Sequence, residues 1–386
     1  MKYRDFGRQG WQVSALGFGC MRLPTTDGFM LSANVEEDLA IAMIRRAIDA
    51  GVNYVDTAYP YHMGKSELVV GEALKDGYRE RVTLATKSPV WQVLKVGDYD
   101  TYLDEQLTRL QTDRIDYYLF HGLGAERWKS LVDLGIIPRA EAAVADGRIG
   151  HIGFSFHDGL ESFKEIVDSY DGWSMCLIQH NYMDIENQAG TEGLRYAASK
   201  GLAVVIMEPL LGGNLARPPG DVSAILEEGE PGRTPADRAL QWLWNQHEVS
   251  CVLSGMTSME QVEENLRSAD SSGVGTLTDR ELGIIDRARE AYQKKSAIAC
   301  TQCGYCMPCP HGVDIPQNMQ LYNQGLMFGD LFAPRFIYFR RLGEGERAAA
   351  CEACGECLEK CPQGVPIDEW MPRIHEVLGE GKDYPA

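Results

Sequence analysis

Eight cysteines near the end of the chain have spacings suited to metal ligation. The sequence has 386 residues and 11 cysteines. The eight that follow residue 299 form two groups: Cys300, Cys303, Cys306 and Cys309, then Cys351, Cys354, Cys357 and Cys361. Thiols three residues apart indicate metal ligands in a reducing compartment, where disulfides are rare. The other three cysteines are scattered, and we expect them to be small buried hydrophobes: Cys20, Cys176 and Cys251.

The second group matches a metal-binding pattern at every position. It reads C-x2-C-x2-C-x3-C-P and ends in Cys361 and Pro362, which is the pattern of bacterial ferredoxins that hold [4Fe-4S] clusters. The first group ends in Cys309 and Pro310 and has two residues instead of three before its last cysteine. Zinc is the alternative metal, but zinc sites use two separated C-x2-C pairs and need no third cysteine or C-P ending. We therefore expect iron–sulfur clusters.

Resemblance to two-cluster ferredoxins implies that ligands are exchanged between the two groups. In those proteins three cysteines of a group hold one cluster, and the fourth, followed by proline, binds the other cluster. Carried over to this chain, one set is Cys300, Cys303, Cys306 and Cys361, and the other is Cys351, Cys354, Cys357 and Cys309. Ligation of each cluster by the four cysteines of its own group remains the alternative.

Four residues of the first half of the chain are suited to acid–base chemistry: Asp56, Tyr61, Lys87 and His121. Asp56, Lys87 and His121 each close a short apolar run, and Tyr61 follows Asp56. A tyrosine has a pKa of about 10, and a neighbouring cation favours loss of its proton. Lys87 can provide that cation, Asp56 can hold Lys87, and His121 can hydrogen-bond a carbonyl oxygen. Such a group would polarise a C=O bond and protonate it. Tyr59 is the alternative acid, although the spacing from Asp56 favours Tyr61.

These residues need a fold that brings the ends of several strands together. Between residues 15 and 268 the sequence alternates eight short apolar runs with longer amphipathic segments. The runs are Ala15–Gly19, Asn53–Asp56, Thr83–Lys87, Asp116–His121, His151–Ser155, Met175–Gln179, Ala203–Glu208 and Cys251–Ser254. Eight strand–helix repeats predict an α/β fold, a closed parallel (β/α)8 TIM barrel, better than an open sheet. Polar residues at the C-terminal ends of barrel strands share one mouth.

The segments outside these repeats complete the expected organisation. Residues Lys2–Arg4 and Gln12–Ser14 can pair as a hairpin that closes the bottom of the barrel. The Gly/Pro-rich stretch Leu210–Pro235 is expected to be a long loop over the active face. Helical patterns cover Asp279–Lys295 and Gln317–Leu326. We predict two domains, a barrel over residues 1–298 and a small α-helical ferredoxin-like domain over residues 299–386.

Composition and charge exclude several classes of protein. The chain has 37 basic and 56 acidic side chains, a net charge of −19, and lacks a basic run, which argues against nucleic acid as a partner. Its 44% hydrophobic and 24% charged residues are typical of a globular protein. No apolar run approaches the roughly 20 residues that cross a bilayer, and the N-terminus lacks an apolar signal segment. We therefore expect a cytoplasmic protein without a membrane segment.

Residues 1 to 268 resemble the aldo-keto reductase family. The resemblance rests on MKYRDFGRQGWQVSALGFGCMRLP, YVDTAYPY, LATK, DYYLFHG, IGFS and SGMTSMEQVEENL, which occur in the order of the family. It implies a (β/α)8 barrel that reduces a small carbonyl substrate, an aldehyde or ketone, with NADPH or NADH. The family's catalytic aspartate falls on Asp56, its general-acid tyrosine on Tyr61, its lysine on Lys87 and its histidine on His121.

The same resemblance implies where the dinucleotide would bind. The nicotinamide contacts fall on Ser155 and Gln179. The rest of the predicted cofactor-binding set is Gly19, Met21, Arg22, Pro209, Leu210, Gly255, Met256, Gln261 and Asn265. The chain departs from the family at Phe156, where many members have asparagine, and at Glu208, where an aromatic strand end is common. Gln261 stands in place of an arginine that often binds the 2′-phosphate, so the resemblance favours NADP over NAD only slightly.

Together these features predict a fused oxidoreductase with a carbonyl-reducing barrel and two [4Fe-4S] clusters. Clusters move single electrons whereas nicotinamide moves a hydride, so a flavin is normally needed between them, and the sequence has no flavin fingerprint. The clusters are therefore expected to be structural, to contact a redox partner protein, or to serve a flavin in the barrel mouth. The rival prediction is an electron-transfer subunit whose barrel binds a partner, nucleotide or flavin without carbonyl reduction.

Overall fold

The computed structural model describes residues 1–28, 32–300 and 302–385, which divide into two compact units. The first unit comprises Met1–Leu211 with Ala236–Asp279, and the second comprises Gly212–Pro235 with Arg280–Ala386. Compactness therefore groups residues 212–235 and 280–298 with the cysteine-rich end of the chain. The domain boundary after residue 298 follows the sequence pattern instead, and it stays a prediction.

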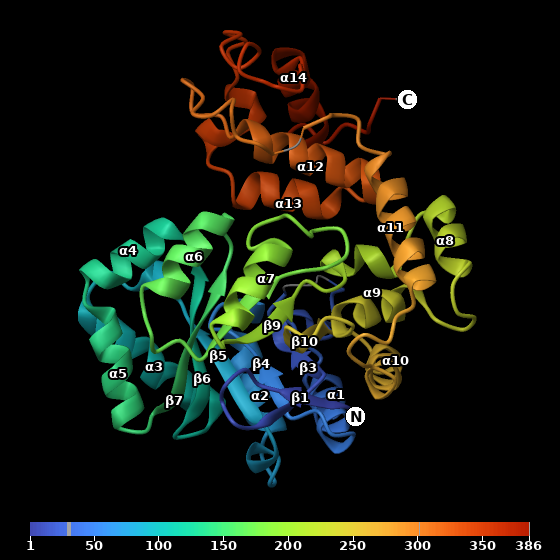
Figure 1. Ribbon diagram of the computed structural model, residues 1–386. Helices are drawn as coiled ribbons and strands as arrows, with labels where there is room; N and C mark the ends of the chain where they lie inside the picture. Colours follow the sequence, from blue (N-terminus) through green and yellow to red (C-terminus); the bar gives the residue numbers. More distant parts are fainter. Residues whose placement is uncertain (29–31, 301, 386) are drawn as a thin grey trace. The chain divides into compact units, whose positions relative to one another are not determined.

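Eight parallel strands of the first unit close into a barrel (Figure 1). They are β3 (Leu16–Gly19), β4 (Tyr54–Asp56), β5 (Thr83–Ser88), β6 (Ile115–Leu123), β7 (Ile149–Phe156), β8 (Met175–Gln179), β9 (Ala203–Met207) and β10 (Val249–Gly255). Neighbours in sequence are neighbours in the barrel, and β10 pairs with β3 to close it. Each strand overlaps one of the eight apolar runs, so the predicted (β/α)8 barrel is confirmed.

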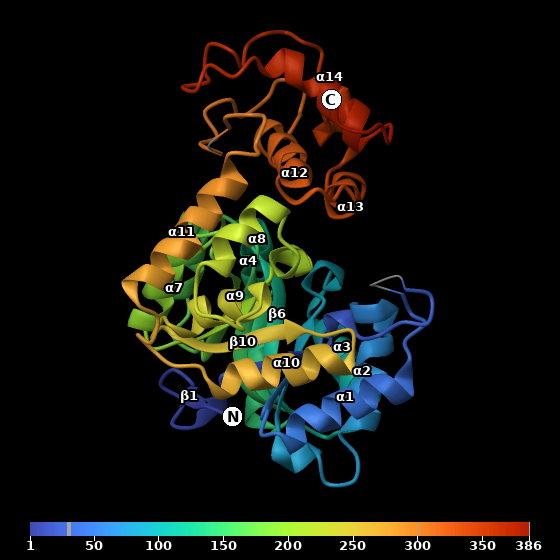
Figure 2. The same cartoon turned by 90° about the vertical axis from the view of Figure 1, so that its right-hand side faces the viewer.

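Helices lie outside these strands (Figure 1). They are α1 (Glu37–Asp49), α2 (Lys65–Ala73), α3 (Val96–Leu110), α4 (Ala125–Asp133), α5 (Ile136–Ala145), α6 (Leu160–Asp168), α7 (Gly190–Ser199), α9 (Pro235–Trp244) and α10 (Met259–Asp270). In α1 the buried residues Ala40, Met43, Ile44 and Ala47 recur at intervals of three and four, which gives the helix one apolar face. Helix α1 packs between α2 and α10, as Figure 2 shows.

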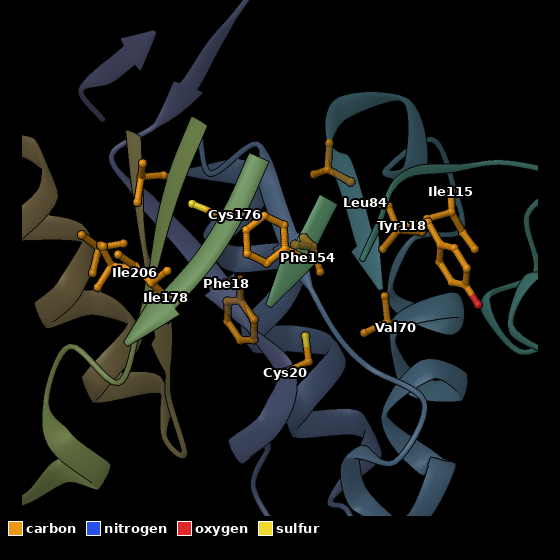
Figure 3. Close-up of a cluster of buried hydrophobic side chains, with 14 of the residues drawn as sticks. Phe18, Cys20, Val70, Leu84, Ile115, Tyr118, Phe154, Cys176, Ile178 and Ile206 are labelled. Carbon is orange, nitrogen blue, oxygen red and sulfur yellow. The ribbon is translucent and has the colours of Figure 1, made fainter. Parts of the chain in front are cut away.

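The apolar core between strands and helices contains two of the scattered cysteines. Figure 3 shows Cys20 and Cys176 among apolar side chains that include Phe18 and Phe154. Cys251 lies in a separate cluster inside the barrel. All three thiols are fully buried, and burial raises the pKa of each above its ordinary value. The prediction that they are small buried hydrophobes is confirmed.

A short hairpin plugs the N-terminal end of the barrel. Strands β1 (Tyr3–Asp5) and β2 (Gln12–Ser14) pair in antiparallel register, as predicted. Phe6 and Trp11, from the turn, join the cluster inside the barrel with their ring centroids 4.7 Å apart. The Trp11 indole N–H donates to the hydroxyl of Tyr117, near the start of β6, at 3.0 Å. The hairpin covers the N-terminal end of the barrel, so a substrate would enter at the opposite end, where the strands have their C-termini.

The second unit is helical. Its helices are α8 (Gly220–Glu227), α11 (Asp279–Gln293), α12 (Ile315–Phe328), α13 (Phe332–Arg340) and α14 (Ile367–Leu378), of which α11 and α12 match the two predicted helices. Figure 2 shows α12 together with α13 and α14, and α12 packs against both. Among the described residues, no helix combines the length and apolar character needed to cross a membrane.

The stretch Leu210–Pro235, predicted as a long loop, contains two helical segments. A short 3-10 helix covers Leu211–Ala216, and α8 follows it. Val222 and Leu226, four residues apart, are buried on one face of α8. Two ion pairs connect α8 and α11 at their ends. Lys295, two residues after α11, pairs with Asp221 of α8 at 2.9 Å, and Arg287 of α11 pairs with Glu228, the residue after α8, at 2.6 Å. The density of glycine and proline in this stretch hid a helix that tertiary contacts stabilise.

Candidate functional site

The four residues predicted to be catalytic come from three adjacent strands and the loop after the first. Asp56 is the last residue of β4, Lys87 lies near the end of β5, and His121 lies near the end of β6. Tyr61 begins a short 3-10 helix five residues after Asp56. Because these strands are parallel neighbours, their C-terminal ends meet at one side of the barrel mouth.

Lys87 is the centre of this group. Its ammonium donates to Asp56 Oδ1 at 2.6 Å, to the Thr57 carbonyl oxygen at 2.7 Å and to the Tyr61 hydroxyl at 3.2 Å. Both members of the Lys87–Asp56 ion pair are buried. Three hydrogen bonds use all three protons of the ammonium, so its position and that of the phenol are tightly defined.

Electrostatics keep the Tyr61 phenol protonated and Lys87 charged. Burial raises the pKa of Tyr61, and the Lys87 ammonium opposes that rise. For Lys87 burial works against the charge, but Asp56 and Tyr61 outweigh it and raise the pKa of the ammonium. The site therefore holds a neutral phenol next to a fixed cation. This cation can stabilise the phenolate that forms when the phenol gives up its proton.

His121 faces Tyr61 across the mouth. Their ring centroids are 5.9 Å apart and nearly perpendicular. The pairing of β6 with β7 shifts register between Phe120 and Leu123, which re-aims the side chain at the strand end. Trp91, 41% exposed, lies with its ring centroid 5.1 Å from that of His121. Sequence reasoning missed Trp91 as a residue of this mouth; its place directly after β5 was the available signal.

The alternative acid, Tyr59, has other partners. Its hydroxyl donates to Glu105 Oε2 at 3.0 Å, and the Arg109 guanidinium lies over its ring at 4.2 Å. Tyr61, not Tyr59, therefore carries the hydroxyl that Lys87 contacts.

One group of the residues predicted to bind the dinucleotide lies at the C-terminal ends of β3 and β10 and just after β3. Gly19 ends β3 and pairs with both Asp56 and Gly255, while Met21 and Arg22 lie in the short 3-10 helix Cys20–Arg22. The Arg22 guanidinium donates to Glu208 Oε1 at 2.9 Å. A Cβ atom on Gly255 would lie 3.2 Å from Arg22 Cβ, so the absence of a side chain permits this close approach.

The remaining predicted cofactor residues lie at the ends of β7 to β10 and in α10. Ser155 and Gln179 are at the ends of β7 and β8, and Pro209 and Leu210 follow β9. Met256 follows β10, and Gln261 and Asn265 belong to α10. Asn265 Nδ2 donates to Ser254 Oγ at 2.9 Å, which joins α10 to β10. The set therefore continues from the catalytic group around the mouth of the barrel.

Two of the noted departures from the family have structural consequences. Phe156 is fully buried with its ring centroid 5.0 Å from that of Phe163, so it is part of the core. Glu208 has a positive φ of 53°, a left-handed conformation that is uncommon outside glycine and asparagine, and its carboxylate pairs with Arg22.

The cysteines of the second unit line two hollows. Cys300, Cys303, Cys306 and Cys361 line one of them. The other is lined by Cys309, Cys351, Cys354 and Cys357, and Cys306 borders it as well. The last cysteine of each group therefore lies in the hollow of the other group.

The two cysteine groups share one backbone conformation. Gln302 and Ala353, each two residues after the first cysteine of a group, have positive φ values of 60° and 53°. Gly304 and Gly355 follow with φ values of 74° and 80°. The Ala353 N–H donates to the sulfur of Cys351 at 3.4 Å, and hydrogen bonds to ligand sulfurs are a feature of iron–sulfur sites.

The repeat continues beyond the cysteines. The segments CPHGVDI (309–315) and CPQGVPI (361–367) each bury their valine and isoleucine and lead into α12 and α14. Sequence reasoning missed this internal repeat, although the shared pattern C-P-x-G-V-x-I was a visible signal.

Comparisons with known proteins agree with both parts of the chain. Residues 15–290 match the profile of the Aldo/keto reductase family, and residues 299–365 match that of the 4Fe-4S dicluster domain. L-galactose dehydrogenase of Arabidopsis thaliana is 28% identical over 308 residues, 74% of this chain and 94% of that protein. NADH-specific methylglyoxal reductase of Escherichia coli (strain K12) is 26% identical over 343 residues, 76% of this chain and 100% of that protein.

Solved structures show the same relationship. An aldo-keto reductase from Bacillus halodurans, in its holo form, matches with a TM-score of 0.62 and 28% identity, over 75% of this chain and 96% of that one. The chain therefore belongs to the aldo/keto reductase family of oxidoreductases, and a 4Fe-4S dicluster domain follows its barrel.

Proposed function

We propose that the barrel reduces an aldehyde or ketone to an alcohol with NADPH or NADH as the electron donor. The observation that carries this proposal is the buried Lys87 ammonium, which donates to both the Asp56 carboxylate and the Tyr61 hydroxyl. Relatives named for L-galactose and for methylglyoxal support a small carbonyl compound or its alcohol as substrate.

Each residue of the mouth has one task in this reaction. Tyr61 donates its proton to the carbonyl oxygen, and Lys87 stabilises the phenolate that remains. Asp56 keeps Lys87 charged, and His121 hydrogen-bonds the carbonyl oxygen and polarises the C=O bond. A bound nicotinamide dinucleotide supplies the hydride that adds to the carbonyl carbon. The proposed reduction therefore needs no residue that acts as a nucleophile.

The described residues fit a dinucleotide along the mouth. Gly19 and Gly255 are neighbours in adjacent strands, and a Cβ at Gly19 would lie 3.3 Å from the Ser254 carbonyl oxygen. Glycine at position 19 lets the two strands approach each other closely, and neither glycine places a side chain between the backbone and a ligand. Gln261 is uncharged, and its Oε1 accepts from the Thr257 N–H at 2.8 Å. Because no cation stands at this position, we expect NADH to be accepted as well as NADPH.

We propose that the second unit holds two [4Fe-4S] clusters with exchanged ligands. Cys300, Cys303, Cys306 and Cys361 would hold one, and Cys351, Cys354, Cys357 and Cys309 the other. The lining of the two hollows by these sets supports the exchange. The N–H donor to Cys351 suits a thiolate ligand. Such clusters supply one-electron chemistry.

The clusters need not take part in the carbonyl step, because hydride transfer moves two electrons at once. We therefore propose that they stabilise the second unit, exchange electrons with a redox partner protein, or serve a flavin bound at the barrel mouth. Cys306 is buried in the apolar cluster of this unit, and the other ligand cysteines that pack against it include Cys300 and Cys351. That placement supports a structural contribution.

Replacement of Tyr61 by phenylalanine tests the proposed activity. Loss of a positioned general acid lowers turnover by about 100- to 10,000-fold. Tyr61→Phe should lose carbonyl reduction to this extent and keep its affinity for the dinucleotide. Tyr59→Phe is the matched control, because its hydroxyl contacts Glu105 instead of Lys87. Carbonyl reduction that survives in Tyr61→Phe at the wild-type rate would contradict the proposal.

A further inference from the structure

A network of polar side chains follows β8 at the barrel mouth. Gln179, the last residue of β8, donates from Nε2 to Asp184 Oδ2 at 2.6 Å. Asn181 donates from Nδ2 to the same carboxylate oxygen at 3.1 Å and to the Glu208 carbonyl oxygen at 3.1 Å. The network therefore connects the end of β8 to the end of β9.

Backbone groups determine the direction of the Asn181 hydrogen bonds. Asn181 Oδ1 accepts from the N–H groups of Met183 and Asp184, each at 2.9 Å. Backbone N–H groups only donate, so the Asn181 amide can present only its NH2 group to Asp184. As a carboxylate, Asp184 only accepts, so Gln179 turns its own NH2 group toward Oδ2 as well.

The consequence is a fixed polarity for Gln179. Its Nε2 is held by Asp184, and its Oε1 is left as the acceptor at the strand end. Gln188 Nε2 donates to this oxygen over a long 3.4 Å, and a carbonyl oxygen accepts two hydrogen bonds. One acceptor position of Gln179 therefore remains for a ligand N–H.

Ser155, on the neighbouring strand β7, has the opposite polarity. Its Oγ accepts the Gly122 N–H at 2.7 Å, so its hydroxyl hydrogen is the part available to a ligand. A primary carboxamide offers one carbonyl oxygen and one NH2 group. Ser155 as donor and Gln179 as acceptor match those two ends in one orientation only.

We propose that Asp184 is a positioning residue for the nicotinamide carboxamide. It fixes Gln179 so that Oε1 accepts from the carboxamide NH2 group while the Ser155 hydroxyl donates to the carboxamide oxygen. This inference rests on the proposed function, because it requires a nicotinamide dinucleotide at the mouth. It adds a residue that touches neither cofactor nor substrate but determines how the cofactor ring lies.

The test compares ligands that differ only at the carboxamide. In the 3-acetylpyridine analogues of NAD⁺ and NADP⁺ a methyl group replaces the NH2 group, which removes the donor and keeps the carbonyl oxygen. Binding is measured by calorimetric titration of the anaerobically purified full chain. The analogue should bind about five- to tenfold more weakly than the natural dinucleotide from which it is derived, which is the loss expected for one neutral hydrogen bond.

Variants of Asp184 are compared by one ratio, the affinity for the natural dinucleotide divided by the affinity for its acetylpyridine analogue. A substitution that weakens binding of both ligands equally leaves this ratio unchanged. Asp184→Leu should lower the ratio to about one, since Gln179 is then free to turn. Asp184→Asn keeps an acceptor oxygen and should restore the wild-type ratio. Asp116→Leu, at the far end of the barrel where Asp116 accepts from the Leu84 N–H, should leave the ratio unchanged.

The outcomes distinguish this inference from the proposed function. A wild-type ratio in Asp184→Leu, with normal binding of the natural dinucleotide, would overturn the inference and leave the proposed function intact. Absence of binding of both NAD⁺ and NADP⁺ to the wild-type chain would overturn both. If Asp184→Leu does not fold, Asp184→Ala removes the same contact to Gln179: a ratio of about one supports the inference, and an unchanged ratio overturns it.

Discussion

Two buried histidines, His62 and His180, lie next to residues of the barrel mouth. His62 Nε2 accepts the Leu23 N–H at 3.0 Å, which holds the segment after β3. His180 is fully buried next to Gln179, with its ring centroid 5.1 Å from that of Trp242. Burial lowers the pKa of both, to about 4 for His180. Each ring is therefore uncharged in the folded protein at neutral pH.

The low pKa of His180 predicts loss of stability in acid. An unfolded histidine titrates near pH 6.5, so below this pH the unfolded chain binds a proton that the folded protein excludes. The contribution is complete above pH 6.5 and is lost as the pH falls toward 4. Between pH 7 and pH 5 we expect the wild type to lose roughly 2 kcal/mol more of its unfolding free energy than His180→Phe.

Urea unfolding followed by tryptophan fluorescence measures this difference at several pH values. The comparison of slopes removes the constant cost of the substitution, because only the pH-dependent part belongs to His180. Equal slopes in wild type and variant would show that His180 does not titrate as its burial implies.

At the scale of elements, the hairpin that plugs the barrel depends on a close backbone contact. Gly7, in its turn, has φ of 51°, and a Cβ there would lie 2.4 Å from the backbone nitrogen of Ala203. Gly10, in the same turn, has φ of 75° but no atom within 4 Å of a Cβ. A substitution at Gly10 therefore introduces backbone strain alone, whereas a substitution at Gly7 introduces both backbone strain and a steric clash.

Alanine at these positions should have unequal effects. Gly10→Ala carries only the cost of a left-handed backbone, about 1 to 2 kcal/mol. Gly7→Ala carries that cost and must also displace the start of β9, so we expect its midpoint of thermal unfolding to be clearly lower. Calorimetry on both variants checks the order, and equal midpoints would mean that the plug does not press on β9.

Some of the elements could be predicted from the sequence and others could not. The eight strands and the group around Lys87 were predictable, because apolar runs and the polar residues that end them are local features. Helix α8 was not, because it lies in a stretch rich in glycine and proline, and its ion-pair partners Arg287 and Lys295 are distant in sequence. The link from Gln179 to Asp184 was hidden too, since hydrogen-bond direction depends on backbone groups around the loop.

At the scale of the whole molecule, the chain combines a proposed hydride-transfer site with two proposed one-electron centres. Cys361 lies beside the first cysteine group and Cys309 beside the second, so the proposed ligand sets would depend on each other. Loss of one group should therefore leave a cluster that still needs a cysteine from the other.

Ligand exchange can be tested in a variant that lacks Cys351, Cys354 and Cys357. The cluster that remains should lose iron when Cys361→Ala is added and keep it when Cys309→Ala is added. Iron and sulfide analysis with electron paramagnetic resonance of the reduced protein measures both. The reverse result, with Cys309 essential and Cys361 dispensable, would establish ligation within each group.

The central claim, that the barrel transfers hydride directly to a carbonyl carbon, has a direct measurement. NADH or NADPH with both C4 hydrogens replaced by deuterium is supplied to the anaerobic full chain with methylglyoxal or another small aldehyde, and the alcohol is examined by mass spectrometry. Direct transfer predicts one deuterium on the carbinol carbon of each product molecule. Product alcohol with solvent hydrogen at that carbon would contradict the account, because the electrons would then have passed through a carrier that exchanges with water.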